Sequence, residues 1–143
     1  MTRRELTAIA VLAAFCACPA FAADESPSLQ EIMQDLRDAL VTVTDGLLTG
    51  QADLVTNGAT AIAAHADISP AQVQIISREL AAEMAAFQQL DALVHEASTE
   101  IASAAGDPEA SLAAYRRMLD GCFACHSSYK ARLSAVLHPA PSP

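Results

Sequence analysis

Two cysteines and a histidine near the C-terminal end of the chain have a spacing that can do chemistry. They belong to the pentapeptide Cys122-Phe123-Ala124-Cys125-His126, which reads C-x-x-C-H. On a helix, residues three and four positions apart lie on one face, so both thiols and the imidazole point to the same side. This pattern is typical of c-type haem attachment, in which the thiols bond the vinyl groups and the histidine binds the iron. We therefore expect one covalent haem c on Cys122 and Cys125, with His126 as proximal iron ligand.

Other uses of a C-x-x-C pair fit the chain less well. A thioredoxin-like redox pair needs a βαβ context, and no segment has the alternation of a strand. A structural zinc site needs four ligands. The remaining histidines, His65, His95 and His138, are scattered and make no zinc-spaced pair. A structural disulfide is the remaining alternative.

The N-terminal segment has the pattern of a secretory signal peptide. Arg3 and Arg4 precede an apolar run over 6–18, and Ala-Phe-Ala at 20–22 is a small-x-small cleavage site. The apolar run is too short to span a bilayer. We expect residues 1–22 to be removed and the remainder to be periplasmic, without attachment to the membrane.

Cleavage would also simplify the cysteine content. Cys16 and Cys18 would leave with the signal peptide, so only the two motif cysteines would remain. Residues 23–138 are then long enough for a single small domain, and the Pro-rich segment 139–143 reads as a flexible tail.

The chain is acidic, with 8 basic and 17 acidic residues and a net charge of −9. This charge disfavours nucleic acid and anionic membranes as partners and favours a partner with a basic docking face. Solubility alone is an equally good explanation of the charge.

The spacing of apolar residues predicts an all-α chain. The first helix begins at Ser28, which forms a capping box with Glu31, and ends at Gly50. Asp53 can cap a second helix that ends near His65.

Two longer periodic stretches follow. The third runs from Ser69-Pro70 to Gly106, which is long for one helix, so we expect a break within 88–91. The last begins at Asp107. Its expected buried stripe is Leu112, Tyr115, Leu119, Cys122, His126, Tyr129, Leu133 and Val136.

Because Cys122 and His126 fall on that stripe, we expect the haem to lie between helices. The predicted fold is an antiparallel four-helix bundle whose core the haem completes.

The C-terminal motif resembles that of the class II cytochromes c, the cytochrome c′ family. The segment from Cys122 to Lys130 is similar to the family pattern C-x-x-C-H-x-x-[YF]-[RK]. Members usually have arginine where Lys130 stands, and lysine keeps the charge but not the planar fork. The resemblance implies a bundle that carries electrons, with a redox protein as partner. The predicted distal helix offers Met33, Leu36 and Leu40 and not the polar acid/base pair that a peroxidase needs, so we expect no enzymatic activity. The family often forms dimers through its first two helices, so a homodimer stays open.

The resemblance also assigns the far side of the haem to the first helix. Met33 falls where the family places a distal residue, which implies that its sulfur is the sixth iron ligand, although Leu29 stands where the family often has arginine. The alternative is a five-coordinate haem that binds NO or CO. Arg37, one turn after Met33, is within reach of a haem propionate, Tyr129 would pack beside the haem, and Lys130 would lie near the proximal histidine.

Overall fold

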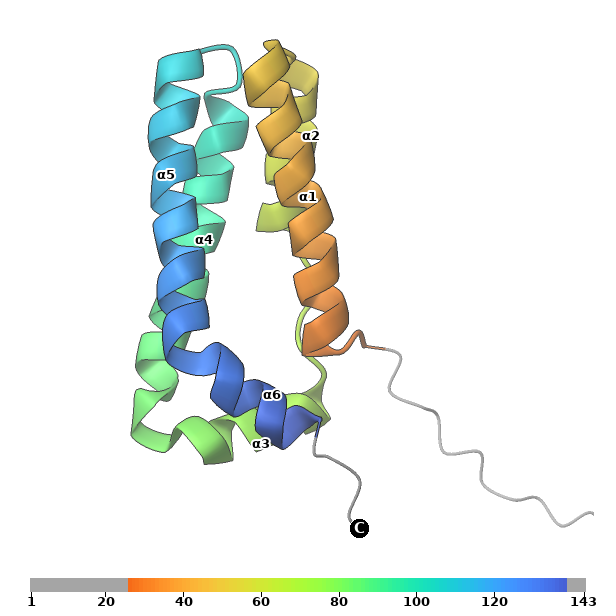
Figure 1. The fold of residues 1–143 in the computed structure, drawn as a ribbon, viewed down its shortest axis with the longest axis vertical. Helices are drawn as coiled ribbons and strands as arrows, with labels where there is room; N and C mark the ends of the chain where they lie inside the picture. The colour runs from red at the N-terminus through yellow and green to blue at the C-terminus, as the bar shows by residue number, and fades with distance from the viewer. Residues whose placement is uncertain (1–25, 139–143) are drawn as a thin grey trace, which may run out of the picture.

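The computed structural model describes residues 26–138, and this part of the chain is helical and contains no strand (Figure 1). The expected signal peptide, including Cys16 and Cys18, and the expected tail at 139–143 lie outside the described residues. None of the helices in 26–138 is both long and apolar enough to cross a membrane.

The first helix, α1 (Leu29–Thr49), begins and ends as its sequence predicts. The Ser28 backbone N–H donates to the Glu31 carboxylate at 2.8 Å, and the Glu31 N–H donates to Ser28 Oγ at 3.2 Å. These two hydrogen bonds satisfy backbone donors that a helix start leaves unpaired. Gly50 ends the helix in the left-handed conformation, at φ 70°.

The second helix, α2 (Ala52–Ala63), begins two residues earlier than expected. Its N-cap is Gln51, whose side chain makes no capping hydrogen bond, and Asp53 lies in the first turn. The prediction that Asp53 caps this helix is therefore wrong. The Gln51 N–H donates to the Gly46 carbonyl at 2.9 Å, so the reversal is tight and the helix starts directly after it.

The third periodic stretch divides into three elements, which are α3 (Pro70–Leu80), the 3-10 turn η1 (Ala81–Glu83) and α4 (Met84–Ser103). The break is at Ala81, which has φ 45°, and not within 88–91. A residue other than glycine held in a sparsely populated backbone conformation with positive φ costs about 1–3 kcal/mol. The break lets Leu80 stay buried at 2% exposure while the chain turns from α3 into α4.

The last stretch is continuous but not uniform. Asp107 accepts hydrogen bonds from the N–H groups of residues 109 and 110, both at 3.1 Å, and α5 (Pro108–Cys125) follows. The π-helical turn η2 (His126–Lys130) then leads into α6 (Ala131–Leu137). Figure 1 shows that the chain changes direction in this region, so that α6 lies across the end of α5.

The four helices α1, α2, α4 and α5 lie side by side, while α3 and α6 pack together at one end (Figure 1). The close pairs are α1 with α2, α4 with α5, and α2 with α4. Two glycines allow α1 and α2 to approach closely. A Cβ on Gly58 would lie 2.8 Å from the Ala39 oxygen and the Val43 nitrogen, and one on Gly46 would lie 2.7 Å from the Val55 nitrogen.

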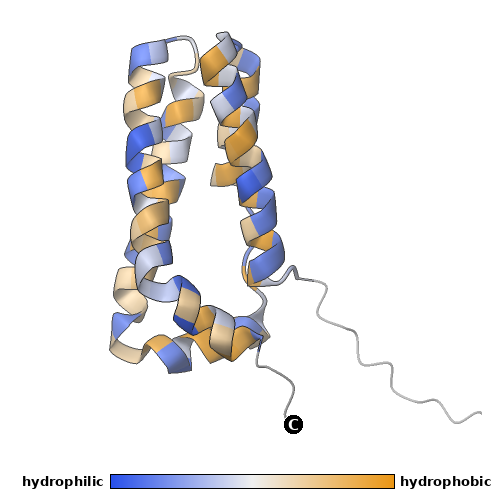
Figure 2. Cartoon of the chain, viewed as in Figure 1, coloured by the Kyte–Doolittle hydropathy of each residue, from blue (hydrophilic) through white to orange (hydrophobic). Residues whose placement is uncertain are grey.

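Polar and apolar residues alternate along each long helix (Figure 2), and the buried apolar residues form two separate clusters. The larger cluster, which we call the packed core, joins α1, α2, α4 and α5, and its buried members are Val43, Val55, Ala59, Ile62, Ala97, Ile101, Ala114 and Met118. The smaller one, which we call the end cluster, joins α3, η2 and α6, and its buried members are Ile76, Leu80, Tyr129 and Leu133.

The buried line of α5 differs from the stripe expected from sequence. Its buried residues are Ser111, Ala114, Met118 and Gly121, whereas Leu112 is 40% exposed. Small residues face the partner because α4 and α5 pack closely, and a Cβ on Gly121 would lie only 3.1 Å from the Val94 side chain. Met118 is the one large apolar residue of this line, whereas Leu112 and Leu119 flank it.

Candidate functional site

A cavity of about 650 Å³ lies between the two clusters, with walls from both ends of the described chain. The N-terminal half of α1, the middle of α4 and the stretch from α5 to α6 contribute most of its lining. The apolar side chains of the wall are Leu29, Ile32, Met33, Leu36, Leu40, Ile62, Ile68, Phe87, Leu90, Val94, Met118, Leu133 and Leu137. An apolar cavity with a few polar groups at its edge is the usual form of a site for a large organic ligand.

All the site residues expected from sequence line this one cavity, and they are Met33, Arg37, Cys122, Cys125, His126, Tyr129 and Lys130. They come from α1 and from the α5–η2 stretch, which are far apart in the sequence. The structure therefore brings together two groups of residues that are far apart in the sequence and that we expected to face the same haem.

The two motif cysteines lie at the junction between the clusters. Cys122 packs against the packed core and Cys125 against the end cluster, and neither is in a disulfide. Burial raises the pKa of both thiols, that of Cys125 to about 11, with smaller contributions from the charges of Cys122 and Asp91. Both thiols are thus protonated at neutral pH.

The motif histidine lies beside the buried line of α5 and not on it. His126 is the first residue of the π-helical turn, its side chain is exposed, and its backbone N–H donates to the carbonyls of Cys122 and Phe123. The expectation that Cys122 and His126 occupy the buried face is corrected accordingly, since Cys122 is only half-buried. A π-helical turn is rare and is often found at functional sites.

Tyr129 is held firmly in the cavity wall. It is 5% exposed, and its ring meets that of Phe87 edge-on, with centroids 5.6 Å apart and planes at 79°. This contact links η2 to α4, so the position of the motif depends on packing and not only on the local helix. Lys130, the next residue, is exposed at the edge of the cavity.

The α1 wall offers one sulfur and one cation. Met33 faces the cavity and is 38% exposed, more than its place on the apolar stripe predicted. Its neighbour Ile32 takes the buried position instead, at 2% exposure. Arg37 forms a surface ion pair with Asp38 at 2.8 Å, so its charge is partly balanced by that carboxylate.

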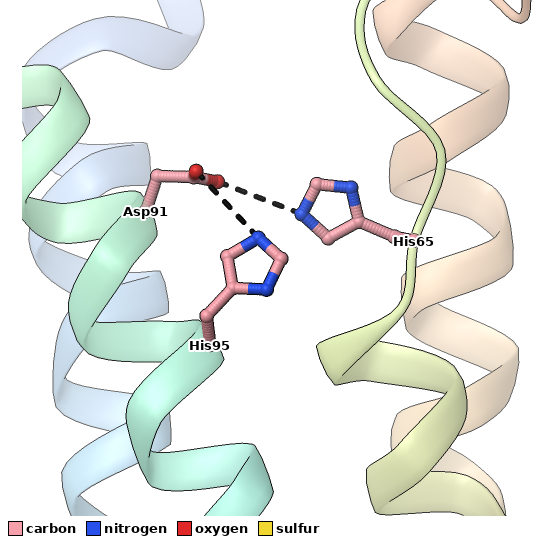
Figure 3. Close-up of side chains that lie close together, drawn as sticks. All are labelled: His65, Asp91 and His95. Atoms are coloured by element: carbon pink, nitrogen blue, oxygen red, sulfur yellow. Dashed lines mark ion pairs between the residues drawn. The ribbon is translucent and has the colours of Figure 1, made fainter.

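One group of polar residues at this cavity was missed by sequence reasoning. His65, Asp91 and His95 lie close together (Figure 3), and the first two also line the cavity. The signal available in the sequence was the spacing of Asp91 and His95, which are four residues apart on one helical face. His65 is added only by the packing of α2 against α4.

No family model, curated protein or solved structure matches the chain. The functional argument therefore rests on the residues that line the cavity and on their chemistry.

Proposed function

We propose that the chain is a periplasmic c-type cytochrome that carries electrons through one covalently bound haem. The observation that carries this proposal is that both cysteines and the histidine of the C-x-x-C-H motif line one largely apolar cavity of about 650 Å³. Pockets for ligands of this class have volumes of about 300–1,000 Å³. The cavity residues therefore suit a flat, mostly apolar group with polar edges.

The motif residues would hold the haem. Each thiol, on Cys122 and on Cys125, would add its S–H across one vinyl C=C bond, which forms a thioether and places the hydrogen on the neighbouring carbon. His126 would supply the proximal imidazole. When bound, the haem supplies the one-electron Fe(III)/Fe(II) couple, and apolar walls that exclude water favour retention of the electron on the iron over side reactions.

The other cavity residues would adjust the reduction potential of this Fe(III)/Fe(II) couple. Met33 would be the sixth ligand, and a thioether ligand raises the potential of haem iron. The cations of Arg37 and Lys130 lie at the cavity and would pair with the propionates. With the haem in place, α1, α2, α4 and α5 would form an antiparallel four-helix bundle whose core is part protein and part porphyrin. The net charge of −9 suits a redox partner with a basic docking face.

Covalent attachment is the first test. The full-length gene is expressed in a bacterial host with cytochrome c maturation, and the purified protein is run on a denaturing gel with haem staining. We expect haem to stay with the wild-type chain and with a Ser128→Ala control, and staining to be lost in the Cys122→Ala/Cys125→Ala double variant. Wild-type protein without bound haem, or haem removed by acid-acetone extraction, would contradict the proposal.

The distal ligand is tested by spectroscopy. Wild-type ferric protein should be low-spin, with a sulfur-to-iron charge-transfer band in the near infrared, and should exclude CO in the ferrous form. Met33→Ala should convert it to a high-spin form that binds CO, whereas Met84→Ala, in the end-cluster region, should leave the spectrum unchanged. If the wild type is already high-spin and binds CO at once, the protein is a gas-binding haem protein and Met33 is a wall residue.

A further inference from the structure

Three side chains beside the haem cavity form a second cluster of possible metal ligands. Asp91 and His95 project from α4, and His65 reaches toward them from the segment after α2 (Figure 3). His65 Nε2 lies 3.6 Å from Asp91 Oδ1, and His95 Nε2 lies 3.7 Å from Asp91 Oδ2. One ligand atom from each residue lies within 4.8 Å of the other two, and the imidazole centroids are 4.5 Å apart.

Backbone carbonyls fix which nitrogen of each ring is available. His65 Nδ1 is 2.9 Å from the Ala66 oxygen, and His95 Nδ1 is 2.8 Å from the Ala63 oxygen. A carbonyl oxygen only accepts, so each Nδ1 must carry the hydrogen and donate it. In the neutral rings both Nε2 lone pairs therefore face the Asp91 carboxylate, which also only accepts.

Three acceptors that face one another need a positive charge between them, which a proton on an imidazole or a metal ion can supply. The arrangement matches the outer shell of known metal sites, in which a ligating histidine donates its second N–H to a backbone carbonyl. We propose that His65, Asp91 and His95 bind one divalent transition-metal ion of the zinc and copper class, for which imidazole and carboxylate are suitable ligands.

The distances allow this with small movements. A tetrahedral zinc ion bonds imidazole nitrogen at about 2.0–2.1 Å, which places neighbouring ligand atoms roughly 3.3 Å apart. The two histidine–carboxylate distances of 3.6 and 3.7 Å, which run to different Asp91 oxygens, exceed that value by a few tenths of an ångström, and the three ligand atoms as a set lie within 4.8 Å of one another. Side-chain rotation can supply this, because the Asp91 side chain is 55% exposed and therefore free to adjust.

Three protein ligands leave a coordination position open, as in zinc sites that bind water or an exogenous group. The site would also join the end of α2 to α4, because His65 follows α2 and the other ligands belong to α4. Metal binding should therefore stabilise the folded chain by mass action. None of its ligands belongs to the C-x-x-C-H motif, so no ligand is shared with the haem, although His65 and Asp91 line the same cavity.

Calorimetric titration of the purified full chain with ZnCl₂ at pH 7.5 tests this proposal. We expect one Zn²⁺ per wild-type chain and at least tenfold weaker binding in His65→Gln and in Asp91→Asn. Asp91→Asn keeps the shape of an exposed side chain, so it should fold. His138→Gln, which removes a histidine outside the cluster, is the matched control and should bind like the wild type.

A second arm excludes the motif as the source of binding, because free thiols also bind zinc. The titration is repeated in a Cys122→Ala/Cys125→Ala background, where one Zn²⁺ should still bind and should raise the melting temperature only while Asp91 and His65 are intact. If the wild type binds no zinc, or if Asp91→Asn and His65→Gln bind as tightly as the control, the three residues form only ion pairs and the proposal is wrong. Failure of haem attachment would leave this second arm unchanged, so the two proposals fail separately.

Discussion

The half of the molecule that carries the turns at Gly50–Gln51 and 104–107 is packed by its own side chains, whereas the half that carries α3 and α6 surrounds a cavity. In the first half, the packed core includes Val43 and Ile101, both fully buried. In the second half, Met33 and the motif histidine are exposed at the cavity wall. The same helices α1, α4 and α5 run through both halves, so the difference comes from residue size and position and not from different elements.

Small residues explain the packed half. Gly46 and Gly58 let α1 and α2 come into backbone contact, and Gly121 allows a side chain of α4 to approach α5 closely. Toward the other end, α2 has ended and the α1 wall consists of longer side chains. The comparison indicates that stability is concentrated at the turn end, while the α3 and α6 end surrounds a cavity.

The largest expected effect comes from truncating matched residues in the two halves. Ile101→Ala should lower the free energy of unfolding by about 2–5 kcal/mol, because it opens a hole in the packed core. Leu90→Ala, at the cavity wall, should cost about 1 kcal/mol in chain made without haem, since it only widens an existing space. Urea denaturation measures both. Equal losses in the haem-free chain would mean that the halves do not differ in packing, and haem attachment should raise the Leu90→Ala cost.

A smaller effect is expected from adding one carbon where α1 and α2 touch. Gly58→Ala should cost about 2 kcal/mol, because the new Cβ would lie 2.8 Å from backbone atoms of α1 that cannot move independently. Gly106→Ala is the control, since a Cβ there meets nothing within 4 Å, and it should change stability by no more than about 0.5 kcal/mol. Thermal or urea unfolding of both variants measures the two changes in stability. A neutral Gly58→Ala variant would show that the helix contact is looser than described.

The smallest effect concerns the cavity half and its dependence on pH. Burial raises the pKa of the Cys125 thiol from 9.0 to about 11, so the unfolded chain loses this proton first. Stability of the reduced, haem-free chain should therefore fall as pH rises from about 9 to 11, by about 1 kcal/mol at most, because the thiol is partly solvated. Unfolding curves of wild type and Cys125→Ala across this range measure the difference. If the free energy of unfolding of the two proteins depends on pH in the same way, the Cys125 thiol is solvated in the folded chain.

Local signals in the sequence predicted both ends of α1 and the start of α5. The Ser28 capping box, Gly50 and the Asp107 cap all act within a few residues of the backbone groups they satisfy, so the sequence alone contains the information. The break at Ala81 has no such signal, because alanine is the best helix former and its residue type does not predict the positive φ that it adopts.

Site residues, like helix ends, could be predicted where the signal is local in the sequence and not where it depends on packing. The C-x-x-C-H motif is a local pattern that the sequence alone contains. Its position at the cavity with Met33 and Arg37 agrees with the expected grouping. Haem binding itself stays a prediction. The predicted buried line of α5 was wrong at Leu112. Close packing against α4 favours small residues such as Ala114 and Gly121 on the buried face. The cluster of His65 with residues of α4 depends on a contact between helices, which periodicity alone does not contain.

The π-helical turn His126–Lys130 has a consequence for how the sequence can change over time. An α-helix rotates about 100° per residue, and a π-helical turn accommodates one residue more than an α-helical turn. Loss of one residue within this turn would return it to an ordinary α-helical turn and leave the phase of α6 nearly unchanged, whereas loss of one residue from α6 before Leu133 would rotate Leu133 by about 100° from its buried place against α3. Chains that descend from the same ancestor and keep this end of the fold should therefore change in length by one residue at this turn more readily than within the helices on either side of it.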